Sequence, residues 1–278
     1  MNKKLYCENL SVTNKKYHIH ITHGPEIDTI NHYIKNGYTK QDKKIFCIDD
    51  SDYTTDEFET FDYTRNNYGF RDCNEEDWSI DNTENETWCF GCSITFGVGV
   101  PNRFSWPSII QKNISNKVRN YGAPGTGVET TFRLLNEWIN TSKYKPQNIL
   151  IHGFFDNRFE IEMNDGWWLQ FQGNAVGRHC LDFPLYRNQI YKKYNQSGML
   201  FKNTIFKINR LAMKHNCNII MLPISDNMEL ISNNYGRDMI NYTSDYYQPH
   251  PGPTYHKDIA NKLLEKLDKS ANRAILIK

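Results

Sequence analysis

The chain has 278 residues, with 33 Lys and Arg against 32 Asp and Glu, so its formal net charge is +1. A chain this close to neutral has no overall field that would attract nucleic acid or an anionic membrane, and we expect neither as a partner. The length is sufficient for one large domain, or for a medium-sized domain with a smaller companion, without disulfides to hold the core together.

The N-terminus and the cysteines indicate a cytoplasmic protein. Residues 1–8 contain lysines but no apolar run follows them, so they do not resemble a secretory signal. No stretch approaches the ~20 apolar residues of a membrane-spanning helix. The odd cysteine count favours reduced thiols. The seven are Cys7, Cys47, Cys73, Cys89, Cys92, Cys180 and Cys217.

Residues 1–80 are expected to form a small accessory region. Pro25 to Asn36 has the pattern of a helix, with proline at its start and Gly37 just past its end, and Lys44 to Ile48 is a candidate strand. The acidic stretch Asp72 to Glu86 is predicted to be a surface connection into the main domain, residues 81–278.

From Trp88 onward, short apolar runs alternate with amphipathic segments, a pattern typical of a parallel sheet wrapped by helices. In such sheets the ligand crevice lies at the carboxyl ends of the strands. The predicted strands are Thr87–Cys92, Lys117–Tyr121, Asn148–Phe155 and Cys217–Ile224. The predicted helices are Val128–Tyr144, Phe201–His215 and a last one that contains Ile259, Leu263, Leu264 and Leu267.

The stretch Glu160 to Arg187 interrupts this alternation and is predicted to be irregular. Long insertions at the edge that faces the site often shape a substrate cleft. Its Trp167 and Trp168 are candidates for stacking on sugar rings, although adjacent tryptophans as often hold a loop against the core.

Four loops carry residues suited to hydrolytic chemistry. Ser93 follows the first predicted strand within a Gly-x-Ser turn and is the candidate nucleophile. His250, in a His-Pro-Gly-Pro stretch, is the candidate base, because imidazole can accept a proton at neutral pH; His256 is an alternative. Asp245 is the nearest upstream carboxylate that could orient the histidine, with Asp238 further back.

The remaining two loops supply candidate donors for an oxyanion. Backbone amides in tight glycine turns can converge on a developing negative charge, so the amides of Ser93 and Gly125 are the natural donors. In the loop after the third strand, either Asp156 or Asn157 could occupy the oxyanion position. We favour Asn157, because its amide donates a hydrogen bond whereas an ionised Asp156 would repel an anion.

The order of these loops resembles the SGNH hydrolases, or GDSL esterases, over about residues 88–267. Gly91-Cys92-Ser93-Ile94-Thr95-Phe96-Gly97 is similar to the first family block, with Cys92 where the family has Asp. Asn120–Gly125 resembles the second block and Gly153–Asn157 the third. In the fifth block, Asp-x-x-His, Tyr247 takes the Asp position, and Asp245 lies five residues before His250. Asn66-x-x-Gly69-Phe70-Arg71 is similar to a stretch that often precedes the first block.

The resemblance implies a flavodoxin-like three-layer α/β/α sandwich and a serine esterase that works through an acyl-enzyme, with Ser93, His250 and Asp245 as triad. The expected substrate is a small-molecule or glycan ester, with O-acetyl groups on carbohydrate favoured. Alternatives are an SGNH-fold glycan-binding or scaffold protein with impaired catalysis, and an O-acyltransferase. No cofactor and no metal are expected.

Some of these residues also have simpler interpretations. Ser93 alone could be a helix cap. Cys89 and Cys92 form a Cys-x-x-Cys, but a polar segment precedes them and no second cysteine pair completes a zinc site, so we expect Cys89 to be a core residue. His18, His20 and His23 alternate along a possible strand, without a nearby Cys or carboxylate partner for a metal.

Overall fold

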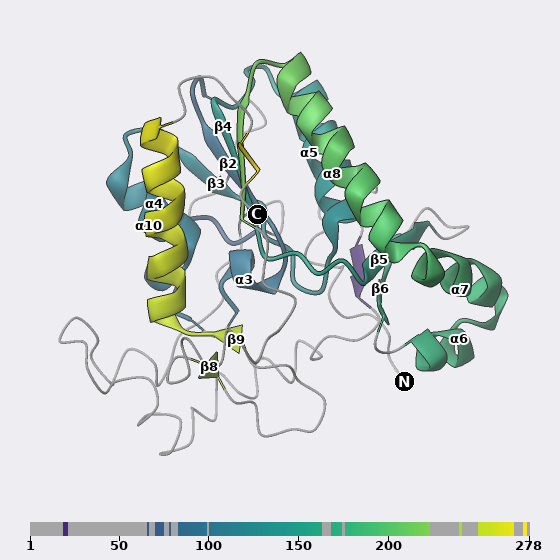
Figure 1. Cartoon of the computed structure of the whole chain (residues 1–278). Helices are drawn as coiled ribbons and strands as arrows, with labels where there is room; N and C mark the ends of the chain where they lie inside the picture. The colour runs from purple at the N-terminus through teal and green to yellow at the C-terminus, as the bar shows by residue number, and fades with distance from the viewer. Residues whose placement is uncertain are drawn as a thin grey trace.

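The computed structural model shows an α/β protein (Figure 1). It describes residues 19–21, 66, 70–74, 78, 83–98, 100–162, 168–173, 176–222, 239–240, 250–269 and 275–276. The helix expected at Pro25–Asn36 and the strand expected at Lys44–Ile48 lie outside these residues.

The centre of the fold is a parallel sheet with strand order β10-β7-β4-β2-β3. The first of these strands in the chain, β2, lies between the second and the third, β3 and β4, as in flavodoxin-like sheets. Every described neighbouring pair is parallel. The strands are β2 (Thr87–Phe90), β3 (Val118–Asn120), β4 (Asn148–His152), β7 (Asn218–Leu222) and β10 (Ile275–Leu276).

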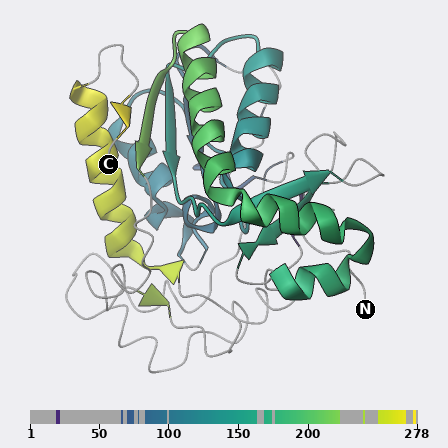
Figure 2. The same ribbon diagram turned by 45° about the vertical axis from the view of Figure 1, so that its right-hand side comes forward.

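Helices cover both faces of this sheet (Figures 1 and 2). On one face lie α5 (Val128–Thr141) and α8 (Ser197–Lys214); on the other lie α4 (Trp106–Asn113) and α10 (Pro253–Lys269). The expected three-layer α/β/α sandwich is therefore confirmed.

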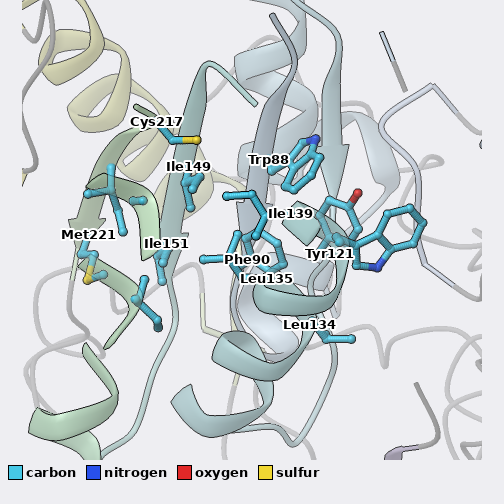
Figure 3. Close-up of a cluster of buried hydrophobic side chains, with 14 of the residues drawn as sticks. Trp88, Phe90, Tyr121, Leu134, Leu135, Ile139, Ile149, Ile151, Cys217 and Met221 are labelled. Atoms are coloured by element: carbon cyan, nitrogen blue, oxygen red, sulfur yellow. The ribbon is translucent and has the colours of Figure 1, made fainter. Parts of the chain in front are cut away.

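Alternation along each strand distributes the core between the two layers. Trp88 and Phe90 pack towards α5 and α8, whereas Cys89 packs towards α4 and α10. All five residues of β4 are buried, which explains why its sequence is a nearly continuous apolar run. Figure 3 shows the cluster of buried side chains between the sheet and helices α5 and α8. Burial of one large side chain of this cluster, such as Leu135, contributes about 1.5–3 kcal/mol to the stability of the fold.

The four predicted strands are confirmed, each one shorter in the described residues than expected. The predicted helices are confirmed as α5, α8 and α10, and α8 begins four residues before Phe201. Cys89 is buried in the core, as expected.

The prediction that Glu160–Arg187 is irregular is wrong. β5 (Arg158–Glu162) pairs antiparallel with β6 (Trp168–Gln172), and β1 (Ile19–Ile21) adds to β6 in parallel. The helical elements α6 (Val176–Asp182), η5 (Pro184–Tyr186) and α7 (Arg187–Asn195) follow. β5 in fact alternates charged and apolar residues, Arg-Phe-Glu-Ile-Glu, which is the pattern of a strand.

The interpretation of Asp72–Glu86 as a surface connection is wrong at both of its ends, since Asp72 and Glu86 are buried. Glu86 pairs with Arg119 at 2.8 Å and accepts a hydrogen bond of 2.8 Å from Nε1 of Trp88. Asp72 accepts hydrogen bonds from Nε1 of Trp78 and from the amide of Asn74. Each carboxylate therefore accepts at least one hydrogen bond from a buried donor.

No helix in the part of the chain that the structure describes combines the length and the apolar character that crossing a bilayer requires.

Candidate active site

The turn after β2 is the most constrained part of the site. β2 ends at Phe90, and a short helix, α3 (Ser93–Phe96), begins three residues later. A Cβ on Gly91 would lie 1.8 Å from the carbonyl oxygen of His152 and 2.1 Å from Oγ1 of Thr95. Only glycine fits there, because β4 and α3 approach the backbone so closely.

Ser93 is the first residue of α3 and is 6% exposed. Its Oγ contacts Sγ of Cys92 at 3.7 Å, in the geometry of a weak hydrogen bond. The N-cap position belongs to Cys92, and no side chain caps this helix. The helix-cap interpretation of Ser93 is therefore wrong, and its hydroxyl is left for another role.

The loop after β3 lies beside this turn. Asn120 donates from Nδ2 to the carbonyl of Thr95 at 3.0 Å, and the amide of Ala123 donates to the carbonyl of Gly91 at 2.9 Å. Gly125 follows with φ of 80°, a left-handed conformation that favours glycine. The second predicted block is thus hydrogen-bonded to the first.

The loop after β4 reaches the same turn through Gly153. A Cβ on Gly153 would lie 3.3 Å from Sγ of Cys92. Asp156 and Asn157, the two alternatives for the oxyanion position, are both exposed in the turn that leads into β5. The carbonyl of Asn157 accepts a hydrogen bond of 2.9 Å from the amide of Gly173. The assignment of Asn157 as an oxyanion donor stays a prediction.

Sequence reasoning missed Arg158, the residue after Asn157. Its Nη1 donates to the carbonyl of Thr126 at 3.5 Å, and its guanidinium lies 4.3 Å from the centre of the Phe155 ring. Burial lowers the pKa of Arg158, and the electrostatic interaction with Cys92 acts in the opposite direction. The available signal was a basic residue directly after a loop at the carboxyl end of a strand.

A second arginine, Arg71, contacts the C-terminal end of α3 and the residues that follow it. The Arg71 guanidinium donates to the carbonyls of Gly97 at 2.6 Å, Val100 at 3.0 Å and Phe96 at 3.4 Å. Arg71 is 1% exposed. Asn66 and Phe70 close the preceding loop by exchanging two hydrogen bonds. The Asn66–Arg71 motif, which had no assigned role in the sequence, holds the residues that end α3.

The strand that contains His250 comes to the same place. β9 (His250–Pro251) pairs antiparallel with β8 (Met239–Ile240) and packs against α3 (Figure 1). The side chain of His250, as well as Asp245 and Asp238, lies outside the described residues. The structure therefore brings the backbone of His250 to the helix that begins at Ser93, and the triad itself stays a prediction.

His152 and His256 have structural contacts. Nδ1 of His152 lies 2.8 Å from the carbonyl of Leu222, which only accepts, so Nδ1 carries the proton and Nε2 accepts from the Tyr255 hydroxyl at 2.9 Å. Burial lowers the pKa of His152 to about 4, so its ring is neutral at pH 7. Nδ1 of His256, which is fully buried, accepts from the amide of Trp106 at 3.2 Å. Neither ring is arranged as a base for Ser93.

Trp168 lies in β6, half-buried, with the Arg133 guanidinium 4.7 Å from its ring centre. It lines a hollow with residues of α5, α7 and α8, and no residue of the Ser93 turn lines that hollow. Trp167 is outside the described residues. A substrate-binding role for these tryptophans stays a prediction.

The described residues contain no group of three or more His, Cys, Asp or Glu side chains that could hold a metal ion. Burial raises the pKa of the Cys89 thiol, which disfavours the thiolate that redox chemistry requires. Of the three N-terminal histidines, only His20 falls in a described strand, β1.

No model of a known protein family matches the sequence, and no curated protein matches it. Solved structures do. A lipolytic protein of the G-D-S-L family from Veillonella parvula has 17% identity and a TM-score of 0.36, covering 66% of this chain and 99% of that one. A putative lipolytic protein of the same family from Desulfitobacterium hafniense has 13% identity and a TM-score of 0.39, with the same coverage.

A carbohydrate esterase family 2 enzyme from Corynascus thermopiles is also similar, with 12% identity, a TM-score of 0.36, and coverage of 69% of this chain and 68% of that one. The first two of these proteins carry the G-D-S-L family name that the sequence blocks resemble. Similarity at this level carries no argument about activity, so the functional proposal depends on the residues of the site.

Proposed function

We propose that the chain is a serine ester hydrolase in which Ser93 is the nucleophile and His250 is the base. The observation that carries the proposal is the meeting of α3, which begins at Ser93, with β9, which contains His250, although 156 residues separate the two in sequence. The meeting occurs at the carboxyl ends of β2 and β4, where the strand order reverses and flavodoxin-like sheets bind their ligands.

In the proposed reaction, Oγ of Ser93 attacks the ester carbonyl while its proton passes to the ring of His250, with Asp245 orienting the imidazole. The tetrahedral intermediate then collapses, and the leaving alcohol takes the proton from the imidazolium. Water, deprotonated by the same ring, attacks the acyl-enzyme, which releases the acid and restores the serine. Each step conserves protons and needs no cofactor.

The developing oxyanion requires donors on the other side of the carbonyl. The first amides of a helix have no partner within the helix, which makes the amide of Ser93 available. The amide of Gly125 and the side chain of Asn157 are the other proposed donors. Loss of one such donor typically costs about 2.7–4 kcal/mol of transition-state stabilisation.

The proposed substrate is a carbohydrate O-acetyl ester. A small acyl group suits a nucleophile that is only 6% exposed at the end of a tight turn. The polar composition of the chain, with 38% hydrophobic residues, favours a sugar over a lipid as the alcohol. Transfer of the acyl group to a sugar hydroxyl would use the same acyl-enzyme, and product analysis with an added acceptor distinguishes the two reactions.

A second candidate is a binding protein of the same fold with impaired catalysis. The observation that favours it is the contact of the Ser93 hydroxyl with Cys92. Hydrolysis of a small aryl acetate separates the two. Ser93→Ala is expected to lower turnover by several orders of magnitude, whereas Ser142→Ala, a buried serine at the far end of α5, should leave it unchanged. Equal rates for the native chain and Ser93→Ala would leave only the binding protein.

A further inference from the structure

Charges are segregated along this nearly neutral chain. Residues 183–225 contain seven basic residues and no Asp or Glu: Arg187, Lys192, Lys193, Lys202, Lys207, Arg210 and Lys214. Residues 49–62 contain seven acidic residues and no Lys or Arg: Asp49, Asp50, Asp52, Asp56, Glu57, Glu59 and Asp62. The near-zero net charge therefore hides two stretches of opposite sign.

The seven basic residues all lie on α7 and α8, on the outside of the molecule (Figures 1 and 2). Met199, Phe206 and Met213 of α8 are 54%, 62% and 68% exposed. They are spaced seven residues apart, which places them on one side of the helix, and Lys202 and Arg210 fall on the same side. We call these five residues the α8 outer face.

All large apolar side chains that are exposed in the described residues lie between Leu181 and Met213, five of them on α7 and α8. They are Leu181, Leu185, Tyr191, Tyr194, Met199, Phe206 and Met213. A group of exposed apolar side chains on one part of a surface is typical of a site that another element covers.

The cations of the α8 outer face have no carboxylate partner among the described residues. Of the seven basic residues, only Lys193 forms an ion pair with a described carboxylate, at 3.0 Å from Glu129. Arg210 lies over the ring of Phe206, and Lys207 lies over the ring of Phe132. The surface therefore carries uncompensated positive charge.

A hollow of about 350 Å³ opens between α5 and α8 beside this face. Phe132, Trp168, Thr204 and Lys207 are among its lining residues, together with the carboxylates Glu129 and Glu160. It admits an aromatic side chain, with Lys207 at its edge.

We propose that residues 49–62 of the same chain bind along the α8 outer face. Their seven carboxylates are opposite in sign to the basic residues of α7 and α8, six of which have no described carboxylate partner. Their three aromatic residues, Tyr53, Phe58 and Phe61, are suited to cover the exposed Met and Phe side chains or to enter the hollow. Binding of residues 49–62 to the α8 outer face neutralises both charged stretches within one chain. We therefore favour this segment over a lipid surface or a second copy of the chain.

The attachment of the segment supports this arrangement. Asp62 is four residues before Asn66, which is hydrogen-bonded to Phe70, and Phe70 belongs to the same core cluster as Ile208 of α8. The segment is therefore tethered on the α5–α8 side of the sheet. Seventeen residues back to Asp49 can span up to roughly 55–60 Å, while α8 is only about 27 Å long. Tethering also raises the effective concentration of the segment.

Zero-length carbodiimide cross-linking of the full chain tests the proposal, because it joins a lysine amine to a carboxylate in contact with it. Peptide mapping should find links from residues 49–62 to Lys202, Lys207 or Lys214, reduced severalfold at ~1 M salt. Lys257, exposed on α10 at the other face of the sheet, should give none and is the internal control. Absence of links to α8 would overturn the proposal. In a mixture of isotopically labelled and unlabelled chains, links that join only two different chains would overturn it as well.

Charge reversal gives the second readout. Lys202→Glu with Arg210→Glu should raise amide hydrogen exchange of residues 49–62 about tenfold, and Asp56→Lys with Glu57→Lys on that background should restore protection. Lys257→Glu is the matched control. Unchanged amide hydrogen exchange of residues 49–62 after the charge reversal would contradict the proposal. If anionic vesicles bind the native chain and leave the exchange of residues 49–62 unaltered, the α8 outer face binds lipid and not this segment. Both readouts are independent of esterase activity.

Discussion

The hydroxyl of Ser93 contacts Sγ of Cys92 at 3.7 Å, and the guanidinium of Arg158 interacts electrostatically with the same cysteine. Arg158 also donates to the carbonyl of Thr126 at 3.5 Å, so a cation from the start of β5 lies near the turn that carries the proposed nucleophile. Since the negative charge of an oxyanion develops at this turn, the guanidinium is placed to stabilise it or to hold the turn in shape.

Arg158→Met should lower kcat for aryl acetate hydrolysis about ten- to a hundredfold, because a hydrogen bond from a charged group contributes ~1.5–3 kcal/mol. Arg158→Lys, which keeps the charge, should recover part of the loss. Arg187→Met, at an exposed arginine of α7, is the control. Steady-state kinetics with unchanged kcat in Arg158→Met would show that the arginine has no part in the reaction.

Arg71 acts through α3 and is therefore a positioning residue. Because it holds three carbonyls just after the helix, Arg71→Met should lower kcat per folded molecule about tenfold with little change in KM. Arg71→Lys should restore part of it, while Arg103→Met, at a nearby exposed arginine, should behave like the native chain. A loss of stability with kcat per folded molecule intact would limit Arg71 to a structural role.

The ion pair of Glu86 and Arg119 is buried on both sides. Arg119→Met should lower the free energy of unfolding by about 3–5 kcal/mol, because it leaves a buried carboxylate without its cation. The double variant Glu86→Gln with Arg119→Met should lose less than the sum of the two single changes. Urea unfolding measures both, with Lys262→Met, from an exposed pair with Asp258, as a control expected to change stability by less than ~1 kcal/mol. Additive losses would contradict the coupling.

His152 should make stability depend on pH. Its pKa in the folded state is about 4, against 6.5 for an unperturbed histidine, so the unfolded state binds more protons between these values. The contribution is fully present above pH 6.5 and is lost as pH falls towards 4, by up to about 3 kcal/mol. Unfolding measured between pH 4.5 and 7.5 should show this slope, and His152→Gln should flatten it. An equal slope in the variant would contradict the assignment.

Much of the fold could be predicted from the sequence, because buried parallel strands are apolar runs and their helices have a periodic apolar face. The run through β4 and the spacing of Leu134, Leu135 and Ile139 in α5 are such signals. The β5–β6 hairpin was missed because Glu160 and Gln170 are polar but buried: both accept or donate hydrogen bonds with Thr130 and each other. Local sequence does not reveal partners that come from distant elements.

The same limit applies to the site. The turns at Gly91 and Gly125 could be predicted, because tight backbone geometry requires a particular residue type. Arg158 and Arg71 could not, since each donates to the carbonyl of a residue tens of positions away, Thr126 and Gly97 respectively. Burial of Asp72 and Glu86 likewise depends on donors that a linear pattern of acidic residues does not show.

The most direct test of the central claim is covalent trapping at Ser93. An aryl phosphonate should label the native chain once, at the peptide that contains Ser93, and His250→Ala should slow this labelling by several orders of magnitude, because the serine loses its base. Ser142→Ala should be labelled like the native chain. Labelling that is absent, or that occurs elsewhere and at the same rate in His250→Ala, would contradict the proposal that these two residues form one catalytic site.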